Sequence, residues 1–461
     1  MYLSLCLIAK DENSYLKEWL DFHILLGVEH FWIYDNDSEI PLEQTIQPYI
    51  QKGWVTINHI QGKGMQLYAY DHCIQTYGTL TRWIGFIDTD EFIIPRTGEN
   101  LPNFLANYEK FGGLALSSLF FGAGGNQIRP MCGQIAGYQI RVPEDLSTNR
   151  LIKSIIQPDK VLFPISPHSF MYSEGNYCVN EVGNRVDTQF FPCSVTKIQL
   201  NHYYTRSAQE WKEKISRGRG DMGDPYSDKR WENANIHSKV IDDSAIKLTL
   251  KFLSLPRAIE RNLTALTDSH SSKFLDELST AAETKNPAMC TAKSYGSIEK
   301  RDELSKLIQD FLDGMDFIET RQFQEARNLY SKMLQQFPFD LTQYTNLATA
   351  CIQLRDFPTA WEALSQAWQM SPKNWTVLLC MVDYFYAIGN FEQVEKCSFL
   401  LQGFGNLEPI GVAVLALAQW KMGKHSEAFN SARLLLPQLT PELAASHVWF
   451  QEMLEIMKPQ K

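Results

Sequence analysis

In the first 120 residues, short apolar runs alternate with stretches whose apolar positions recur every three or four residues. Short apolar runs are typical of buried β-strands, and the second pattern is typical of amphipathic helices. We predict strands at residues 2–9, 31–34 and 54–60 and in the run that ends at Asp88, and helices at residues 14–26, 42–51 and 65–76. Strands separated by helices predict a mostly parallel sheet, which binds ligands at the carboxyl ends of its strands.

After residue 120 the pattern changes. A glycine-rich loop at residues 122–125 comes first, and three later strands are predicted at residues 137–142, 160–163 and 195–200. A basic helix is predicted to begin near Ser207. Residues 222–300 are polar and partly helical, and their pattern does not divide into elements.

The last third of the chain repeats every 34 residues. Small residues recur at Ala326, Ala360, Val394 and Ala428, each preceded by a turn residue at Arg321, Arg355, Gly389 and Gly423. Small residues at close helix contacts are what stacked helical hairpins require, and residues 303–445 resemble the tetratricopeptide repeat (TPR). We therefore predict an α/β domain at residues 1–265, a linker at 266–302 and an all-α domain of TPR-like repeats at 303–461.

The composition of the chain argues against several classes of function. A net charge of −10 over 461 residues argues against general nucleic-acid binding, which needs a basic face. No apolar run reaches 18 residues, so no membrane span is expected, and the first residues lack the basic start of a signal peptide. The nine cysteines are scattered and form no Cys-x-x-Cys, a usage that favours a reducing cytoplasm.

The strongest chemical signal is the turn Asp88-Thr89-Asp90, followed by Glu91. Residues i and i+2 of an extended chain point to one side about 6–7 Å apart, so Asp88 and Asp90 can serve one Mg²⁺ or Mn²⁺. The alternative is a solvated turn after a strand. The position after a buried strand favours the metal site, with Glu91 as a third ligand, a base or a neighbour of the ligands.

A second signal lies near residues 198–207. His202 ends an apolar run and can complete a manganese site as a neutral imidazole, although a lone histidine is more often structural. Lys214, Arg217 and Arg219 follow in a segment that can close over phosphates. The alternative for these three cations is a solvated basic surface.

Polar residues at the other strand ends suit a nucleotide. We predict that Lys10, Glu12, Asp35 and Asp37 hold the base and the ribose, and that Gln66, Tyr70 and Asp71 share a helix face toward the same edge. His168 is a candidate contact for an acceptor sugar. His23 lies on an apolar helix stripe and is predicted to belong to the core.

Several motifs in order resemble the family-2-like and family-92 glycosyltransferases. They are Cys6-Leu-Ile-Ala-Lys10-Asp-Glu12-Asn, Glu18-Trp-Leu-Asp-Phe-His23, Tyr34-Asp35-Asn36-Asp37-Ser38, Ala69-Tyr-Asp-His-Cys73, Phe86-Ile-Asp88-Thr-Asp90-Glu91-Phe92, Pro167-His168-Ser-Phe and Leu200-Asn-His202-Tyr-Tyr. The resemblance covers residues 1–225. It implies a GT-A (Rossmann-like) fold, a UDP-sugar or other nucleotide-sugar donor, a divalent metal and inversion at the anomeric carbon. Asp71 departs from the asparagine that relatives often carry.

The resemblance implies a hexosyltransferase that works by single displacement. A carboxylate takes the proton of the acceptor hydroxyl as it attacks C1. Glu91 and Asp90 are the predicted catalytic residues, and Glu144, Asp145 and Glu181 are further candidates for the base. The acceptor is expected to be a glycan or another compound with a hydroxyl group, and a transferase fused to helical repeats suits bacterial surface-polysaccharide synthesis.

Two other functions stay open on the sequence. A metal-dependent nucleotidyltransferase also uses acidic sites beside a parallel sheet. A scaffold is the second, with a degenerate transferase domain and repeats that bind a partner. In an active enzyme the repeats are expected to bind a protein partner or to mediate self-association.

Overall fold

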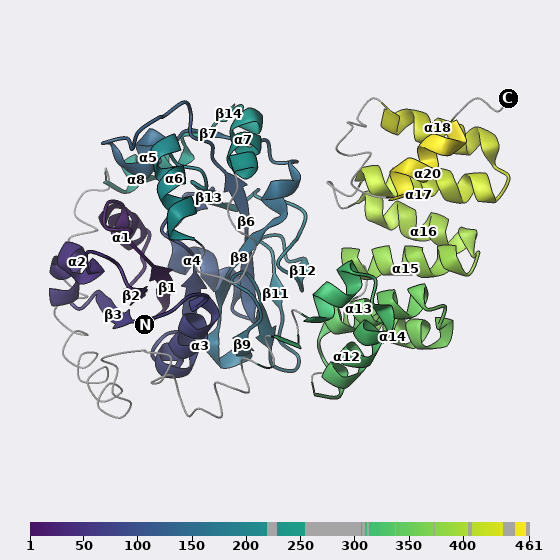
Figure 1. The fold of residues 1–461 in the computed structure, drawn as a ribbon, viewed down its shortest axis with the longest axis horizontal. Helices are drawn as coiled ribbons and strands as arrows, with labels where there is room; N and C mark the ends of the chain where they lie inside the picture. The colour runs from purple at the N-terminus through teal and green to yellow at the C-terminus, as the bar shows by residue number, and fades with distance from the viewer. Residues whose placement is uncertain are drawn as a thin grey trace. The chain divides into compact units, whose positions relative to one another are not determined.

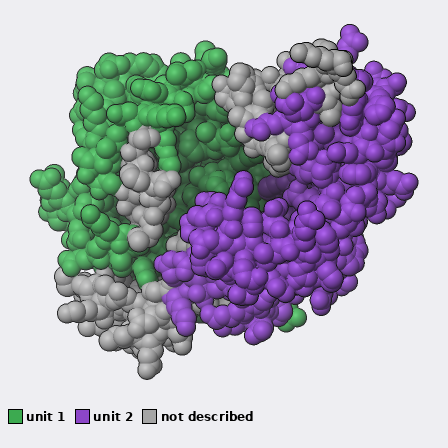
Figure 2. All heavy atoms as spheres, turned by 45° about the vertical axis from the view of Figure 1, so that its right-hand side comes forward, with its two compact units in different colours: residues 1–305 green, residues 306–461 purple. Residues whose placement is uncertain are grey.

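The computed structural model divides the chain into two compact units, Met1–Ser305 and Lys306–Lys461, coloured separately in Figure 2. It describes residues 1–218, 228–253, 306, 309–310, 313–336, 338–371, 374–403, 408–436 and 448–457. The predicted linker at 266–302 and the predicted phosphate contact Arg219 lie outside these residues. Among the helices described, none combines the length and the apolar character that crossing a bilayer requires.

A mixed sheet forms the centre of the first unit (Figure 1). Its strand order is β12-β11-β6-β8-β4-β1-β2-β3, and β13 pairs with both β5 and β6. The bounds are β1 Leu3–Ala9, β2 His30–Asp35, β3 Val55–His59, β4 Trp83–Phe86, β5 Glu91–Pro95, β6 Gly113–Phe120, β8 Ile152–Ile156, β11 Cys178–Val179, β12 Arg185–Val186 and β13 Ile198–His202. Two small sheets pair β9 (Val161–Pro164) with β10 (Phe170–Tyr172) and β7 (Ile140–Arg141) with β14 (Val240–Ile241).

The prediction of a mostly parallel sheet holds in part, because five of the nine strand pairings described for this sheet are parallel and four are antiparallel. Strands β4, β1, β2 and β3 pair in parallel, as the alternating pattern predicts. Strand β8 then runs antiparallel between β4 and β6. The pattern missed β8 because Lys153 and Ser154 interrupt its apolar run, and both side chains are buried.

Helices complete the first unit. They are α1 Leu16–Leu25, α2 Leu42–Gln51, α3 Gln66–Tyr77, α4 Leu101–Leu105, α5 Gly133–Gly137, α6 Ala208–Arg217, α7 Asp228–His237 and α8 Ser244–Leu253, with 3₁₀ turns η1 Gly78–Leu80, η2 Ala106–Tyr108, η3 Ser147–Arg150 and η4 Pro158–Lys160. The strand predicted at 137–142 is wrong over its first residues. The Glu18 carboxylate accepts from the backbone N–H groups of Gln134 and Ile135 and so caps the short helix α5.

Both faces of the parallel strands are apolar. Along β2, Phe31 and Ile33 belong to one buried cluster and Trp32 and Tyr34 to another. Successive side chains of a strand point to opposite faces, so a strand covered on both sides reads as one continuous apolar run. Residues of α1, α2 and α4 complete the first cluster, and residues of α3 complete the second.

His23 belongs to the core, as predicted. It is fully buried on α1, its Nδ1 lies 2.8 Å from the Trp19 carbonyl oxygen, and its ring stacks on Phe92. Burial lowers the pKa of His23 from 6.5 to about 3.

The unfolding free energy is expected to fall as the pH drops below about 6.5, because the unfolded chain then binds a proton that folded His23 does not bind. The expected slope for this residue is about 1.4 kcal/mol per pH unit down toward its folded pKa. Urea unfolding at pH 7 and pH 5 measures the slope. The variant His23→Gln, which has no titrating group there, should show a smaller one, and equal slopes for the two proteins would contradict the assignment.

The second unit is a succession of helices that pack as antiparallel pairs (Figure 1). The bounds are α12 Phe323–Gln336, α13 Leu341–Gln353, α14 Phe357–Met370, α15 Trp375–Ala387, α16 Phe391–Gln402, α17 Glu408–Lys421, α18 His425–Leu435 and α20 Val448–Met457. All four small residues of the 34-residue repeat are fully buried. The four turn residues before them adopt positive φ angles of 58–78°. The helical-hairpin character that the spacing predicted is therefore confirmed.

Candidate active site

The acidic turn Asp88-Thr89-Asp90 joins β4 to β5 at the carboxyl end of the central strands. The Glu91 N–H donates to the Asp88 carbonyl oxygen at 3.0 Å, and the Asp88 N–H donates to Glu91 Oε2 at 2.8 Å. Two reciprocal bonds close the turn. The Tyr203 N–H donates to the Asp90 carbonyl oxygen at 2.8 Å, which ties the turn to the segment that follows β13.

Two lysines neutralise the carboxylates of this turn. Lys153 Nζ lies 2.8 Å from Asp88 Oδ2 and 3.5 Å from Glu91 Oε2, and Lys214 Nζ lies 2.7 Å from Asp90 Oδ2. Burial acts against the charge of each group. Asp88 and Glu91 nevertheless hold the pKa of Lys153 well above its ordinary value, and Lys214 with His202 holds the pKa of Asp90 well below its own. Lys153 and Asp90 therefore stay charged although they are buried.

His202 ends β13 directly opposite Glu91 on β5. Its Nδ1 lies 3.5 Å from Glu91 Oε1, and its Nε2 lies 3.6 Å from Asp90 Oδ1. The structure thus brings His202 to the acidic turn, 112 positions along the chain from Asp90. Burial raises the pKa of Glu91 to about 7, with Asp88 adding to the rise and Lys153 opposing it.

The donor chemistry of Asp88, Asp90 and His202 fits a manganese or magnesium ion. Two carboxylates and an imidazole are acceptable ligands for Mn²⁺, and Asp90 Oδ1 and His202 Nε2 already face each other. The two carboxylate oxygens of Asp88 contact other protein groups, the Gln66 side chain and Lys153. The role of these three residues as ligands stays a prediction.

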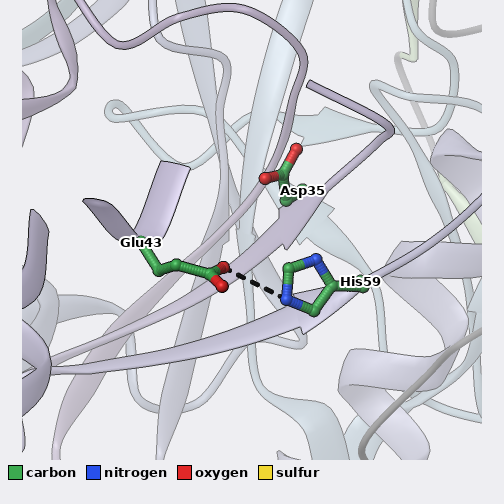
Figure 3. Close-up of side chains that lie close together, drawn as sticks. All are labelled: Asp35, Glu43 and His59. Carbon is green, nitrogen blue, oxygen red and sulfur yellow. Dashed lines mark ion pairs between the residues drawn. The ribbon is translucent and has the colours of Figure 1, made fainter. Parts of the chain in front are cut away.

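Over the described part of the chain, ligand atoms within 4.8 Å of one another come from a different trio, Asp35, Glu43 and His59. Figure 3 shows these side chains together: Asp35 ends β2, His59 ends β3, and Glu43 lies on α2 and forms an ion pair of 3.1 Å with His59. Both oxygens of Asp35 accept backbone bonds, from the N–H groups of Ser38 and Leu42. Asp35 therefore holds the start of α2, which is a structural role that the sequence interpretation did not assign.

Glu12 forms a second cluster with Arg206, which precedes α6, and with Arg217 at the end of that helix. Glu12 accepts from Arg206 Nη1 at 2.8 Å and from Arg217 Nη2 at 2.9 Å, and Arg217 also donates to the Lys10 carbonyl oxygen. Burial opposes ionisation of Glu12, but the two guanidinium groups lower its pKa below the ordinary value. Glu12 is thus paired with two cations of the protein. Arg217 also contacts Lys10, which directly follows β1 and is another predicted nucleotide contact.

A hollow lies beside these clusters. Its lining residues are Asp11, Glu12, Ser14, Tyr15, Arg129, Thr205, Arg206, Glu210, Glu213, Lys214 and Arg217. Lys214 contacts Asp90 of the acidic turn, so the hollow adjoins that turn. Four of the lining residues are cations and four are anions, a composition suited to a polar, charged ligand.

The remaining predicted residues lie at different distances from the turn. Gln66 opens α3 and donates to Asp88 Oδ1 at 3.1 Å and to the Tyr70 hydroxyl at 3.0 Å. Asp71 follows Tyr70 on α3 and is half-buried, and Asp37 is exposed with a φ of 57°. His168 Nδ1 lies 2.8 Å from the Ile152 carbonyl oxygen, next to Lys153 in sequence.

The three further candidates for the base lie in other surroundings. Glu181 is buried and accepts from Ser194 and Thr196, so it supports a loop. Glu144 pairs with Arg96 and Arg141, and Asp145 is exposed.

Sequence reasoning missed Lys153, Arg206 and Gln134. Lys153 had a visible signal, because a lone charged residue inside the apolar run 151–156 must find a partner if the run is a buried strand. Arg206 and Gln134 had none, since their positions follow from contacts between distant segments.

An acidic turn at the carboxyl end of a covered sheet, next to a charged hollow, is the arrangement of an α/β enzyme. The model of glycosyltransferase family 92 matches residues 2–248, which is more than half of the chain. The chain therefore belongs to glycosyltransferase family 92.

Similar curated proteins agree with the family. A glycosyltransferase family 92 protein of Ricinus communis is 28% identical over 231 residues, which are 48% of this chain and 41% of the relative. One from Oryza sativa subsp. japonica is 26% identical over 221 residues, with coverages of 46% and 35%. A galactan β-1,4-galactosyltransferase of Arabidopsis thaliana is 22% identical over 114 residues, 23% of each chain. The chain thus spans less than half the length of these relatives.

Proposed function

We propose that this protein is a glycosyltransferase that moves a hexose from a nucleotide sugar, expected to be a UDP-sugar, to a hydroxyl group of a glycan acceptor. The membership of family 92 supports the reaction class. The observation that carries the proposal for this site is the convergence of Asp88, Asp90 and His202 at one end of the sheet. A GT-A fold for the first unit and TPR repeats for the second are part of the proposal.

Asp88, Asp90 and His202 would hold a Mn²⁺ or Mg²⁺ ion. When bound, such an ion neutralises the diphosphate that leaves with the nucleoside. Lys214, which contacts Asp90, and Arg217 line the adjoining hollow and would bind the phosphate oxygens. Gln66 would keep Asp88 oriented through its side-chain bond.

Asp90 and Glu91 are the proposed residues for the proton of the acceptor hydroxyl. The raised pKa of Glu91, about 7, places its carboxyl group where it can both hold and release a proton near neutral pH. Attack on C1 from the side opposite the leaving diphosphate would invert the anomeric carbon. We propose that five residues surround the nucleoside: Lys10, Glu12, Asp35, Asp37 and Asp71. Glu12 would act through the two arginines that it holds, and Asp35 through the backbone at the start of α2.

The helical repeats of the second unit are proposed to bind a protein partner or to mediate self-association. Stacked hairpins form an extended concave surface suited to a peptide or a second helical element. A cytoplasmic location and a role in polysaccharide synthesis complete the proposal, and the scattered cysteines of the sequence support the first of these.

Hydrolysis of a panel of nucleotide sugars by the full chain with Mn²⁺ tests the reaction. One sugar donor is expected to be consumed faster than the others, with release of a nucleoside diphosphate. Release of pyrophosphate would instead indicate a nucleotidyltransferase. If no donor is consumed and UDP with Mn²⁺ produces no heat in a titration, the transferase proposal fails and the scaffold interpretation takes its place.

A further inference from the structure

The side-chain amide of Gln134 connects the backbone of the acidic turn to Arg206. Gln134, on α5, is fully buried. Its Nε2 donates to the Thr89 carbonyl oxygen at 2.9 Å, and its Oε1 accepts from Arg206 Nε at 3.0 Å. Thr89 lies between Asp88 and Asp90, so the amide contacts the backbone of the turn at its centre.

The chemistry of the two neighbours fixes the orientation of this amide. A carbonyl oxygen can only accept and a guanidinium N–H can only donate, so the position requires a side chain that does both. Glutamine meets this requirement and glutamate does not, because an ionised carboxylate can only accept. The other two carbonyl groups of the turn accept backbone N–H groups, from Glu91 and from Tyr203. Gln134 is therefore the side chain that completes the set.

Arg206 is held as firmly as the turn. Its backbone φ of 48° is left-handed and precedes Ser207, whose side chain caps α6. Nη1 of Arg206 pairs with the buried carboxylate of Glu12 at 2.8 Å, and its guanidinium lies over the Tyr15 ring. Gln134 thus accepts a hydrogen bond from a guanidinium group whose position is fixed by other contacts.

Helix α6 contacts the same turn by a second route, since Lys214 pairs with Asp90. Lys153 and Gln66 hold Asp88 at the other end of the turn. Lys214 holds a side chain of the turn, and Gln134 holds its backbone. Loss of the bond to Thr89 would leave the centre of the turn without its hydrogen bond, and the spacing of Asp88 and Asp90 would then depend on their side-chain contacts and on the backbone bonds at the two ends of the turn.

We propose that Gln134, braced by Arg206, is a positioning residue that sets the backbone of the acidic turn and thereby the relative placement of Asp88 and Asp90. The inference rests on the proposed function where it concerns donor binding, and on the hydrogen bonds alone where it concerns the turn. Gln134 itself touches neither Asp88 nor Asp90 through its side chain, so its effect passes through Thr89.

The variant Gln134→Glu tests the proposal in the full chain. The new carboxylate can keep the contact with Arg206, which favours folding, but its second oxygen faces the Thr89 carbonyl oxygen and repels it. The matched control is Gln139→Glu, the same change just after α5, where the half-buried native side chain donates to the Ala136 carbonyl oxygen in a solvent-exposed hydrogen bond.

Two readouts are measured. Amide hydrogen exchange in a peptide that covers residues 87–92 should speed up at least about tenfold in Gln134→Glu and stay unchanged in Gln139→Glu. The affinity for UDP with Mn²⁺ should fall about 10- to 100-fold in the first variant only, and the KM for the donor should rise with it.

Unchanged exchange at residues 87–92 in a folded Gln134→Glu protein would overturn the proposal. If that variant does not fold, Arg206→Lys replaces it, because lysine keeps the charge next to Glu12 and removes the Nε donor. It should show the same faster exchange, and a normal rate there would also overturn the proposal. A wild-type protein that binds no UDP would refute the proposed function, while the exchange measurement would still decide the role of Gln134.

Discussion

Replacing Asp90 with asparagine is expected to lower glycosyl transfer by about 100- to 1,000-fold. The amide keeps the size of the carboxylate but carries no charge. Asp90 is the group on which Lys214 and His202 converge, at 2.7 and 3.6 Å. Without the negative charge, the proposed cation loses a ligand, and Lys214 loses its ion pair with Asp90 while its bond to the Tyr204 carbonyl oxygen remains. Steady-state kinetics with the preferred donor measure the loss.

The affinity for a nucleoside diphosphate separates this effect from misfolding. UDP with Mn²⁺ should bind Asp90→Asn more weakly, and UDP without metal should bind both proteins almost equally. Asp243→Asn is the matched control, because Asp243 pairs with Lys247 at the surface and takes no part in the site. Wild-type transfer by a folded Asp90→Asn protein would remove Asp90 from the proposed mechanism.

The sequence predicts the acidic turn and His202 for a physical reason. Both follow apolar runs, and the ends of neighbouring strands meet at one edge of a sheet. The structure brings them together through the pairing of β13 with β5, in which His202 lies opposite Glu91. Position after a buried strand predicted that these residues lie at one edge of the sheet, and the family resemblance added the role of His202 as a ligand, which stays a prediction; the pairing partner of β13 could not be predicted.

The same reasoning found polar strand ends without showing what they contact. Glu12 and Asp35 were expected to face a nucleoside. In the structure Glu12 is held by Arg206 and Arg217, and Asp35 caps α2. Carboxylates at strand ends can bind ligands, helix termini or arginines with the same atoms. The choice depends on loops and helices from elsewhere in the chain, which a local pattern does not contain.

The helical unit was easier to predict because its geometry repeats in the sequence. Ala360 and the three residues at multiples of 34 positions from it, Ala326, Val394 and Ala428, are all fully buried. At the turns, arginine stands at 321 and 355 where glycine stands at 389 and 423, yet all four adopt a left-handed backbone. The spacing carried the information, since arginine alone does not predict a positive φ.

Lys153 is the most important residue of the candidate site that the hydrophobic pattern of the sequence did not predict. Its strand, β8, lies antiparallel between β4 and β6, and its side chain is 1% exposed. The ammonium group is the cation that Asp88 and Glu91 share. A charge cluster of this kind cannot be predicted from local periodicity, because the lysine is 65 positions from Asp88 in sequence.

Replacing Lys153 with methionine is expected to lower the unfolding free energy by about 3–5 kcal/mol at pH 8. Methionine fills most of the space of the lysine stem but leaves two carboxylates without their cation. Burial already raises the pKa of Glu91 to about 7 against the opposing effect of Lys153, so the variant should raise it further. Folded Glu91 then binds a proton that the unfolded chain releases near pH 4.5, and stability falls as the pH rises from there. The loss should therefore be smaller at pH 5 than at pH 8.

Lys160→Met is the matched control for the loss of a partly buried lysine. Lys160 Nζ donates to the carbonyl oxygens of Glu109 and Phe111 at 2.9 and 3.0 Å, in a strand connection that follows β8. Its removal should cost about 1–2 kcal/mol at either pH, because no buried carboxylate depends on it. Urea unfolding of both variants at pH 5 and pH 8 decides the question. An equal, pH-independent loss in the two proteins would mean that Lys153 contributes as an ordinary hydrogen-bond donor and does not neutralise Asp88 and Glu91.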